Sequence, residues 1–162
     1  MKIVAAHKLI NVLKIFKMKK TLTLLALTIS FSMNAQVSTN STSPTGIYAS
    51  AMGNGTTASG NESTAMGYDT TASGEASTAM GSSSTASGSR STAMGRSTTA
   101  SSDYSTAMGW STTASGTRSF AGGLQTVASG GGSFAFHSGT TASGTNSTAL
   151  GRVTVASVIM LL

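Results

Sequence analysis

The residue types that most often perform catalysis or bind metal are few in this chain and lie far apart. Its 162 residues include no cysteine, two histidines and four acidic residues. His7 lies near the amino terminus, and His137 lies in an irregular repeat without the clustered ligands of a zinc site. Serine recurs throughout, but no serine has a base at a spacing that would activate it as a nucleophile. The sequence therefore predicts no catalytic residue, no metal site, no cofactor and no enzyme.

Other common ligand sites are also absent from the sequence. Gly131-Gly132 lacks the lysine and the helix of a phosphate-binding loop, and no aspartate recurs as in the calcium-binding nonapeptide repeat. The formal charge of +6 suggests nucleic acid, but all six lysines lie in the first twenty residues. Beyond residue 35, four arginines balance four acids. A nucleic-acid surface needs clustered basic residues, so we expect no nucleic-acid partner.

The first 35 residues have the organisation of a secretory signal. Lys19-Lys20 precede an apolar segment over 21–31, and Ala35 comes before Gln36. The alternative to a signal peptide is a membrane-spanning helix, but the apolar segment is short for one. We predict an upstream extension or misassigned start at 1–17, a signal peptide at 18–35 and a linker at 36–48. The mature chain is then exported, to the outer membrane and cell surface or to the medium.

An unbroken repeat fills the rest of the chain. Alanine recurs every seven residues from Ala51 to Ala156, followed in most halves alternately by Met-Gly and by Ser-Gly, so the period is 14. Each half combines five residues of strand pattern with a variable pair, and these pairs hold every charge beyond residue 35. Over 49–157 this predicts an all-β fold, a parallel β-roll (β-solenoid) of about eight 14-residue coils, with tight turns at the variable pairs. The glycine before each pair is expected to let the chain leave the strand.

Alternation of side chains divides each strand into an inner and an outer set. The Ser or Thr two before each alanine, the alanine and the glycine are small, and we assign them to the interior. Buried hydroxyls there must bond to one another or to the backbone. The residues that flank alanine then face outward. One outer face carries threonine and serine: Thr57, Thr71, Thr85, Thr99, Thr113, Thr141, Ser59, Ser73, Ser87, Ser101, Ser115 and Ser143.

The other outer face is an apolar ladder, and its size suggests an interface between copies. Its members are Met52, Met66, Met80, Met94, Met108, Phe120, Phe134, Phe136 and Leu150. Soluble monomers seldom expose so large an apolar patch, so we expect identical chains to cover it in a closed cyclic assembly. In the alternative arrangement the methionines fill the interior and the chain is a monomer.

Bulky and basic residues of the variable pairs are the candidate ligand contacts. They are Tyr68, Tyr104, Trp110, Arg90, Arg96 and Arg118. A repeated surface favours many weak contacts that act together over one deep pocket.

The repeat Ser-Thr-Ala-Met-Gly-x-x-Thr-Thr-Ala-Ser-Gly-x-x resembles the head repeat of YadA-type trimeric autotransporter adhesins over 49–157. The resemblance implies a left-handed roll, a homotrimer joined through the apolar face, and display on a bacterial outer membrane. It also implies binding to host or environmental surfaces or matrix. Members of the family continue into a stalk and a membrane anchor, whereas residues 158–162 form an atypical apolar tail. We therefore expect a truncated reading frame with no membrane anchor within this chain, or a head that is secreted or held by another subunit.

Two alternative functions fit the same repeat. Similar head repeats precede self-cleaving chaperone domains in other exported fibres, and no such domain is present here. The flat Thr/Ser face is also similar to the threonine arrays of ice-binding β-solenoids, with rungs about 4.8 Å apart.

Overall fold

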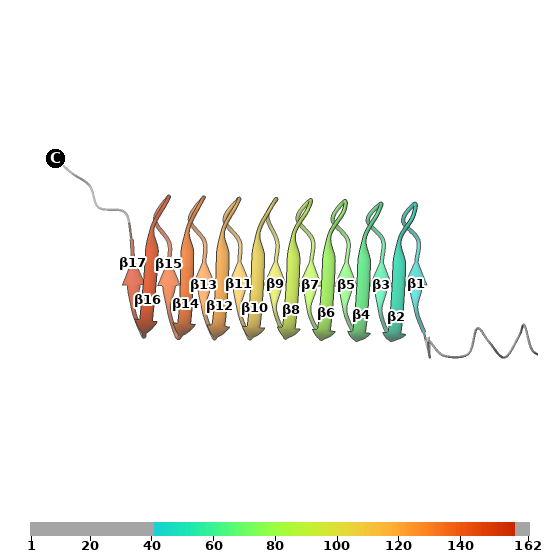
Figure 1. Cartoon of the computed structure of the whole chain (residues 1–162), viewed down its shortest axis with the longest axis horizontal. Helices are drawn as coiled ribbons and strands as arrows, with labels where there is room; N and C mark the ends of the chain where they lie inside the picture. The colour runs from blue at the N-terminus through green and yellow to red at the C-terminus, as the bar shows by residue number, and fades with distance from the viewer. Residues whose placement is uncertain (1–40, 158–162) are drawn as a thin grey trace, which may run out of the picture. The chain divides into compact units, whose positions relative to one another are not determined.

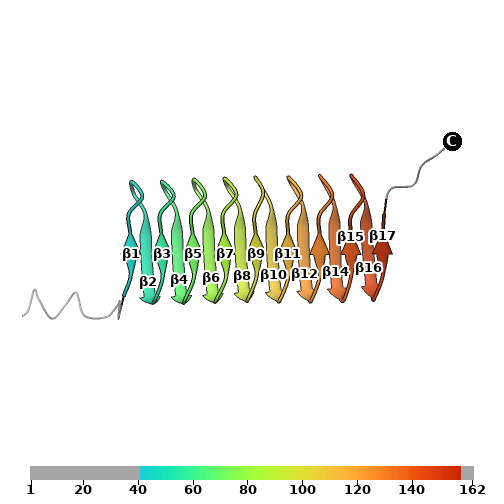
Figure 2. The same cartoon turned by 180° about the vertical axis from the view of Figure 1, so that it is seen from behind.

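The computed structural model of the chain describes residues 41–157. These residues form two parallel sheets that wind together into a β-roll (Figures 1 and 2). The predicted extension at 1–17, signal peptide at 18–35 and tail at 158–162 lie outside the described residues.

One sheet has eight strands of five residues each within the described part of the chain. Its strands are β2 (Ser50–Asn54), β4 (Thr64–Tyr68), β6 (Thr78–Ser82), β8 (Thr92–Arg96), β10 (Thr106–Trp110), β12 (Phe120–Leu124), β14 (Phe134–Ser138) and β16 (Thr148–Arg152). They contain the Ala-Met-Gly halves of the repeat, as predicted.

The other sheet has nine strands over the same stretch, each only two residues long. They are β1 (Ser43–Pro44), β3 (Thr57–Ala58), β5 (Thr71–Ala72), β7 (Thr85–Ala86), β9 (Thr99–Ala100), β11 (Thr113–Ala114), β13 (Val127–Ala128), β15 (Thr141–Ala142) and β17 (Val155–Ala156). The Ala-Ser-Gly halves therefore form shorter strands than the five residues predicted. The first of them, β1, lies inside the range 36–48 that was expected to be a linker.

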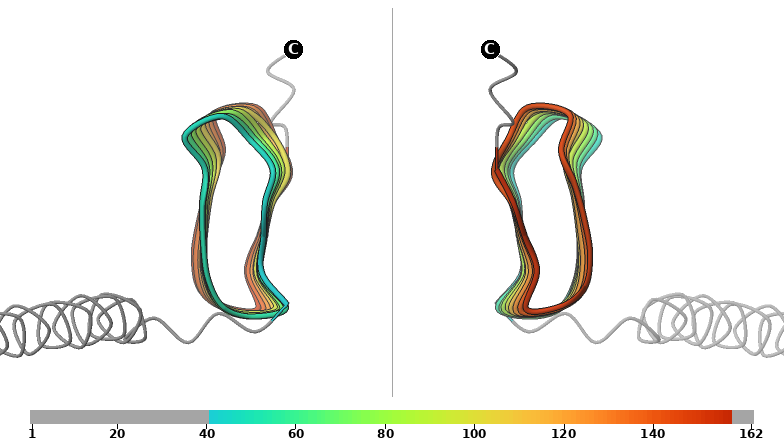
Figure 3. Two further views of the ribbon diagram at one scale, coloured as in Figure 1. Left: turned by 90° about the vertical axis from the view of Figure 1, so that its right-hand side faces the viewer. Right: turned by 90° about the vertical axis from the view of Figure 1, so that its left-hand side faces the viewer.

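Each strand pairs in parallel with the strand one coil further on, and the register is 14 residues throughout. Met52 lies opposite Met66, for example, and Ala58 lies opposite Ala72. Viewed end-on, successive coils nearly superimpose (Figure 3). The predicted all-β roll of about eight 14-residue coils is thereby confirmed.

The interior of the roll is built from small side chains. The alanines from Ala58 to Ala142 are fully buried, and so are the Ser and Thr two residues before them, such as Ser63 and Thr70. The methionines lie on the outside and are partly exposed. The alternative in which methionines fill the interior is therefore not the arrangement found.

The buried hydroxyls bond less completely than predicted. Thr98 Oγ1 donates to Ser84 Oγ at 2.9 Å, and Ser84 Oγ donates to the Gly95 carbonyl at 3.1 Å. Within residues 41–157, however, ten buried hydroxyls, including those of Ser63 and Thr70, have no hydrogen-bond partner. The backbone carbonyls of these residues, such as those of Ser63 and Thr70, already accept hydrogen bonds from backbone amides of the neighbouring coil. The next coil lies about 4.8 Å away, so a short side chain seldom reaches the neighbouring hydroxyl.

The glycines serve two purposes, one of which was predicted. In the Ala-Met-Gly halves, positive φ values such as the 121° of Gly67 show the backbone freedom that was expected, and the second purpose is close packing of the coils. A Cβ atom built on Gly74 would lie 2.0 Å from the Gly88 carbonyl oxygen, and one on Gly67 would lie 2.0 Å from that of Gly81. The backbones of successive coils thus approach closely at two columns, one in each half of the repeat, and glycine is the residue that fits there without overlap. Gly74 is buried, whereas Gly67 is exposed and has a φ of 121°, so the inward placement was right for the Ala-Ser-Gly half only.

The turn itself depends on the second residue of each variable pair. This residue has a left-handed φ at every seventh position from Ser41 to Val153. The φ of Ser41 and that of Val153 are both 55°. Its amide donates to the carbonyl of a turn residue one coil earlier, as Asp69 N does to Asn54 O at 2.8 Å. A left-handed conformation costs a non-glycine residue about 1–2 kcal/mol. The hydrogen bonds of the stacked turns hold it in place.

Ser102 occupies the position that is glycine in the neighbouring Ala-Ser-Gly halves, and so places a side chain in that column of stacked glycines. The amides of Gly88 and Gly116 donate to the Ala100 and Ala128 carbonyls at 3.3 and 3.2 Å. Among the described residues, the Ser102 amide makes no such bond, and its hydroxyl donates instead to the Ser115 carbonyl at 2.6 Å. A serine at this column is therefore accompanied by the loss of the amide hydrogen bond that the neighbouring glycines make.

We predict that Gly74→Ala lowers the free energy of unfolding by about 1–3 kcal/mol, because the new methyl group overlaps the Gly88 carbonyl. Urea unfolding followed by circular dichroism measures the change. Gly131→Ala is the matched control, because a Cβ there would have no atom within 4 Å, and its stability should be unchanged or slightly raised. Equal stability of the two variants would contradict the close-approach explanation.

Candidate interface and ligand-contact residues

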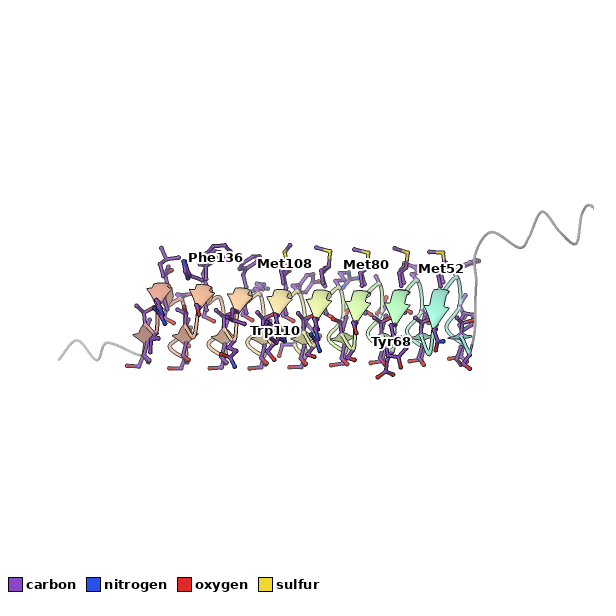
Figure 4. All side chains as sticks on the ribbon, turned by 90° about the horizontal axis from the view of Figure 1, so that it is seen from below. Met52, Tyr68, Met80, Met108, Trp110 and Phe136 are labelled. Carbon is purple, nitrogen blue, oxygen red and sulfur yellow. The ribbon has the colours of Figure 1, made fainter. Side chains whose placement is uncertain are left out.

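The eight-stranded sheet presents the predicted apolar ladder on its outer side. Because side chains alternate, Thr64 and Met66 point outward on either side of the buried Ala65. In-register pairing then places Met66 next to Met52 and Met80. Figure 4 shows Met52, Met80, Met108 and Phe136 projecting along one side of the roll. We call the nine predicted residues of this surface the Met face.

Three phenylalanines replace the regular pattern at β12 and β14. The rings of Phe120 and Phe134 stack with centroids 4.9 Å apart, and those of Phe134 and Phe136 lie 6.3 Å apart. Gly122 occupies the position of a methionine, and a Cβ there would lie 2.8 Å from the rings of both Phe120 and Phe136. The two rings therefore cover the place of the missing side chain. The structure brings all nine residues of the Met face together on one surface.

Exposure increases toward the last coils of the Met face. The methionines are partly buried, whereas Phe134 is 38% exposed, Phe136 46% and Leu150 58%. The apolar surface is thus most accessible over β14 and β16.

The nine-stranded sheet presents the Thr/Ser face on the opposite side of the roll. Threonines such as Thr71 are partly exposed and serines such as Ser73 are exposed. Val127 and Val155 interrupt the threonine row. The face is therefore polar and regular over β3 to β11.

The candidate ligand contacts separate onto the two edges of the roll. Tyr68, Arg96 and Trp110 end the five-residue strands β4, β8 and β10 on one edge. The other three follow the Ala-Ser-Gly halves and hold left-handed turn positions on the second edge: Arg90, Tyr104 and Arg118. The six residues therefore form two groups, one on each edge.

Each edge contains one pair of an arginine and an aromatic residue from successive coils. On the first edge the guanidinium carbon of Arg96 lies 5.5 Å from the centre of the Trp110 ring. On the second, Arg90 lies 5.5 Å from the centre of the Tyr104 ring, and its Nη1 donates to the Tyr104 hydroxyl at 3.1 Å. These distances are within the range of cation–π attraction.

Two turn residues that the sequence reasoning did not single out hold the second edge in shape. Asn61 Oδ1 accepts a hydrogen bond from the Ile47 amide, and Asp103 Oδ1 accepts one from the Ser89 amide, both at 3.0 Å. The sequence signal for this role was an Asn or Asp at the first position of a variable pair, 14 residues after the residue whose amide it binds.

The stretch that the structure describes holds neither a cluster of metal ligands nor a membrane-spanning helix. Residues 41–157 contain no group of three or more His, Cys, Asp or Glu that could hold a metal ion, and His137 is exposed on β14. The same residues contain no helix long and apolar enough to cross a membrane.

Comparison with known proteins identifies the repeat. No curated protein matches the chain. The family described as "YadA head domain repeat (2 copies)" matches residues 45–70, 72–98, 100–126 and 128–154. The four matches follow one another through the roll, span about two coils each and cover more than half of the chain. The resemblance seen in the Ser-Thr-Ala-Met-Gly repeat is thereby confirmed, and the chain belongs to the family of YadA head domain repeats.

Proposed function

We propose that this chain is the head segment of a bacterial surface adhesin that assembles as a homotrimer through its Met face. The leader predicted at 18–35 exports it, and the assembled head binds host or environmental surfaces. The observation that carries the proposal is the continuous apolar Met face on the outside of a roll whose interior is already filled.

The physical reason for assembly is that only contact with another molecule can shield the Met face from water. Ala, Ser and Thr occupy the interior completely, so the methionines and phenylalanines cannot turn inward. A second copy in register places the same apolar residues opposite one another at every coil. Burying such a surface contributes roughly 25 cal/mol for each Å² of apolar area. The Thr/Ser face has no comparable drive, because its hydroxyls are satisfied by water.

Adhesion is supported by what stays outside such an assembly. The Thr/Ser face and the residues of both edges lie away from the Met face, and they recur with each coil. Three copies present the same contacts three times around the axis. Weak contacts of this kind add up through effective concentration.

The assembly is tested on the chain from residue 36 onward by sedimentation equilibrium. We expect a trimer for the unchanged chain and a monomer for Met80→Glu, because an unpaired carboxylate in an apolar interface costs several kcal/mol. Ser87→Glu, a matched change on the Thr/Ser face, should leave the trimer intact. The unchanged trimer should also be retained on immobilised matrix protein better than the monomeric variant. A folded monomer for the unchanged chain, or retention no better than that of serum albumin, contradicts the proposal.

A second candidate function, ice binding, is favoured by the regularity of the Thr/Ser face. Threonines 57, 71, 85, 99 and 113 follow one another in register on strands β3 to β11, with an exposed serine beside each. A flat array of hydroxyls about 4.8 Å apart presents a regular template to water.

Ice binding is checked by recrystallisation inhibition with the segment 36–157. If this candidate function holds, the unchanged segment slows ice-grain growth, and Thr85→Tyr, which disrupts the flat array, abolishes the effect. Met80→Glu on the other face should retain it. Ice-grain growth identical to that in buffer excludes this candidate and leaves the adhesin proposal untouched.

A further inference from the structure

We infer that the coils between Arg90 and Arg118 bind an anionic polysaccharide. This inference rests on the proposed adhesive function and names its ligand class. Its basis is the occurrence of an arginine–aromatic pair on each edge of the roll within the same coils.

The pair on the first edge combines the two chemistries that an acidic sugar requires. Arg96 and Trp110 lie opposite each other on β8 and β10, with the guanidinium carbon 5.5 Å from the ring centre. Trp110 is 53% exposed, so part of its flat apolar surface is open to the C–H face of a pyranose ring. The guanidinium supplies a planar fork of N–H donors that matches a carboxylate or a sulfate.

The pair on the second edge has the same composition. Arg90 lies 5.5 Å from the centre of the Tyr104 ring and donates to the Tyr104 hydroxyl at 3.1 Å. Tyr104 is 50% exposed, and Arg118 holds the equivalent turn position one coil further on. Because each paired guanidinium is held against a ring, less side-chain entropy is lost when an anion binds.

Charge is distributed along the roll so that an anion is directed to these coils. The acids Glu62, Asp69 and Glu75 lie in earlier coils, whereas residues 90–118 contain three arginines and one acid. That acid, Asp103, accepts a hydrogen bond from the Ser89 amide at 3.0 Å. The later coils therefore have a net positive charge, and the earlier coils repel an anionic chain.

The surface between the two edges suits a sugar polymer as well. It is the Thr/Ser face over β9 and β11, where Ser101 and Ser115 are exposed hydroxyls. From Arg90 to Arg118 the surface extends along the roll by about 10 Å, which is two coil steps. Figure 4 shows that Trp110 does not project with the methionine row, which is the surface that the proposed trimer would bury.

The test uses heparin as the anionic probe and dextran as the neutral one, with the trimer formed by the chain from residue 36 onward. We expect the double variant R90Q and R96Q to bind heparin about tenfold more weakly. Trp110→Ser should weaken binding several-fold, and the fold tolerates it because Ser82 and Ser138 occupy the same column. Arg152→Gln is the matched control, because this arginine lies in the same column outside the proposed coils, and it should bind like the unchanged chain.

Several results would overturn the inference. They are unchanged heparin affinity in the double variant, an equal loss in Arg152→Gln, dextran binding as tight as heparin binding, and equally tight binding of duplex DNA, which would indicate charge attraction alone. A trimer that adheres to matrix protein but does not bind heparin overturns this inference and leaves the proposed function standing. Heparin binding that these variants weaken, without retention on any coated surface, supports the site and contradicts the adhesin proposal.

Discussion

The close approach of one coil's backbone to the next is the constraint on which the rest of this structure depends. Parallel hydrogen bonds repeat every 14 residues, and at both columns of glycines a Cβ on one coil would lie about 2 Å from the carbonyl oxygen of the next. Every coil must therefore have the same outline. An insertion, or a bulky residue pointing inward, would separate the coils and break the ladders on both sheets.

This outline explains why the interior is so small. The two sheets lie close enough that alanine, serine and threonine fill the space between them, and no larger side chain is buried there in the described roll. A coil consequently buries little apolar area within itself, and much of its cohesion comes from the hydrogen bonds to its two neighbours. The large apolar residues within 41–157 all lie outside this interior. Nine of them lie on the Met face, and the proposed association with identical chains would bury this surface.

Variation between coils is concentrated in the turns, because a side chain there meets neither the interior nor the stacked glycines. On the two faces it is limited to replacements such as Phe136 on the Met face and Val127 on the Thr/Ser face. Charged residues and the exposed tyrosines and tryptophan lie at these positions, while the repeat positions stay nearly constant. The scaffold thus separates two tasks. The constant residues specify the roll and its Met face, and the turn residues are free to differ in what they contact. Membership of the YadA head repeats consequently defines the architecture of this chain more closely than its ligand.

The 14-residue period was enough to predict the all-β roll and its number of coils, because stacking between coils follows from the repeat itself. Alternation along a strand also predicted the division into inner and outer residues, except for the glycines of the Ala-Met-Gly halves. The tertiary structure was needed for the rest. Only the stacked backbone reveals that glycine is required by a neighbouring carbonyl, and that residues as different as Asp69 and Val153 share a left-handed turn. Likewise, Arg96 and Trp110 are separated by one repeat in the sequence, but their contact depends on the conformation of two side chains at the end of paired strands. A repeat determines which residues are neighbours, whereas the geometry of the turns determines which neighbours touch.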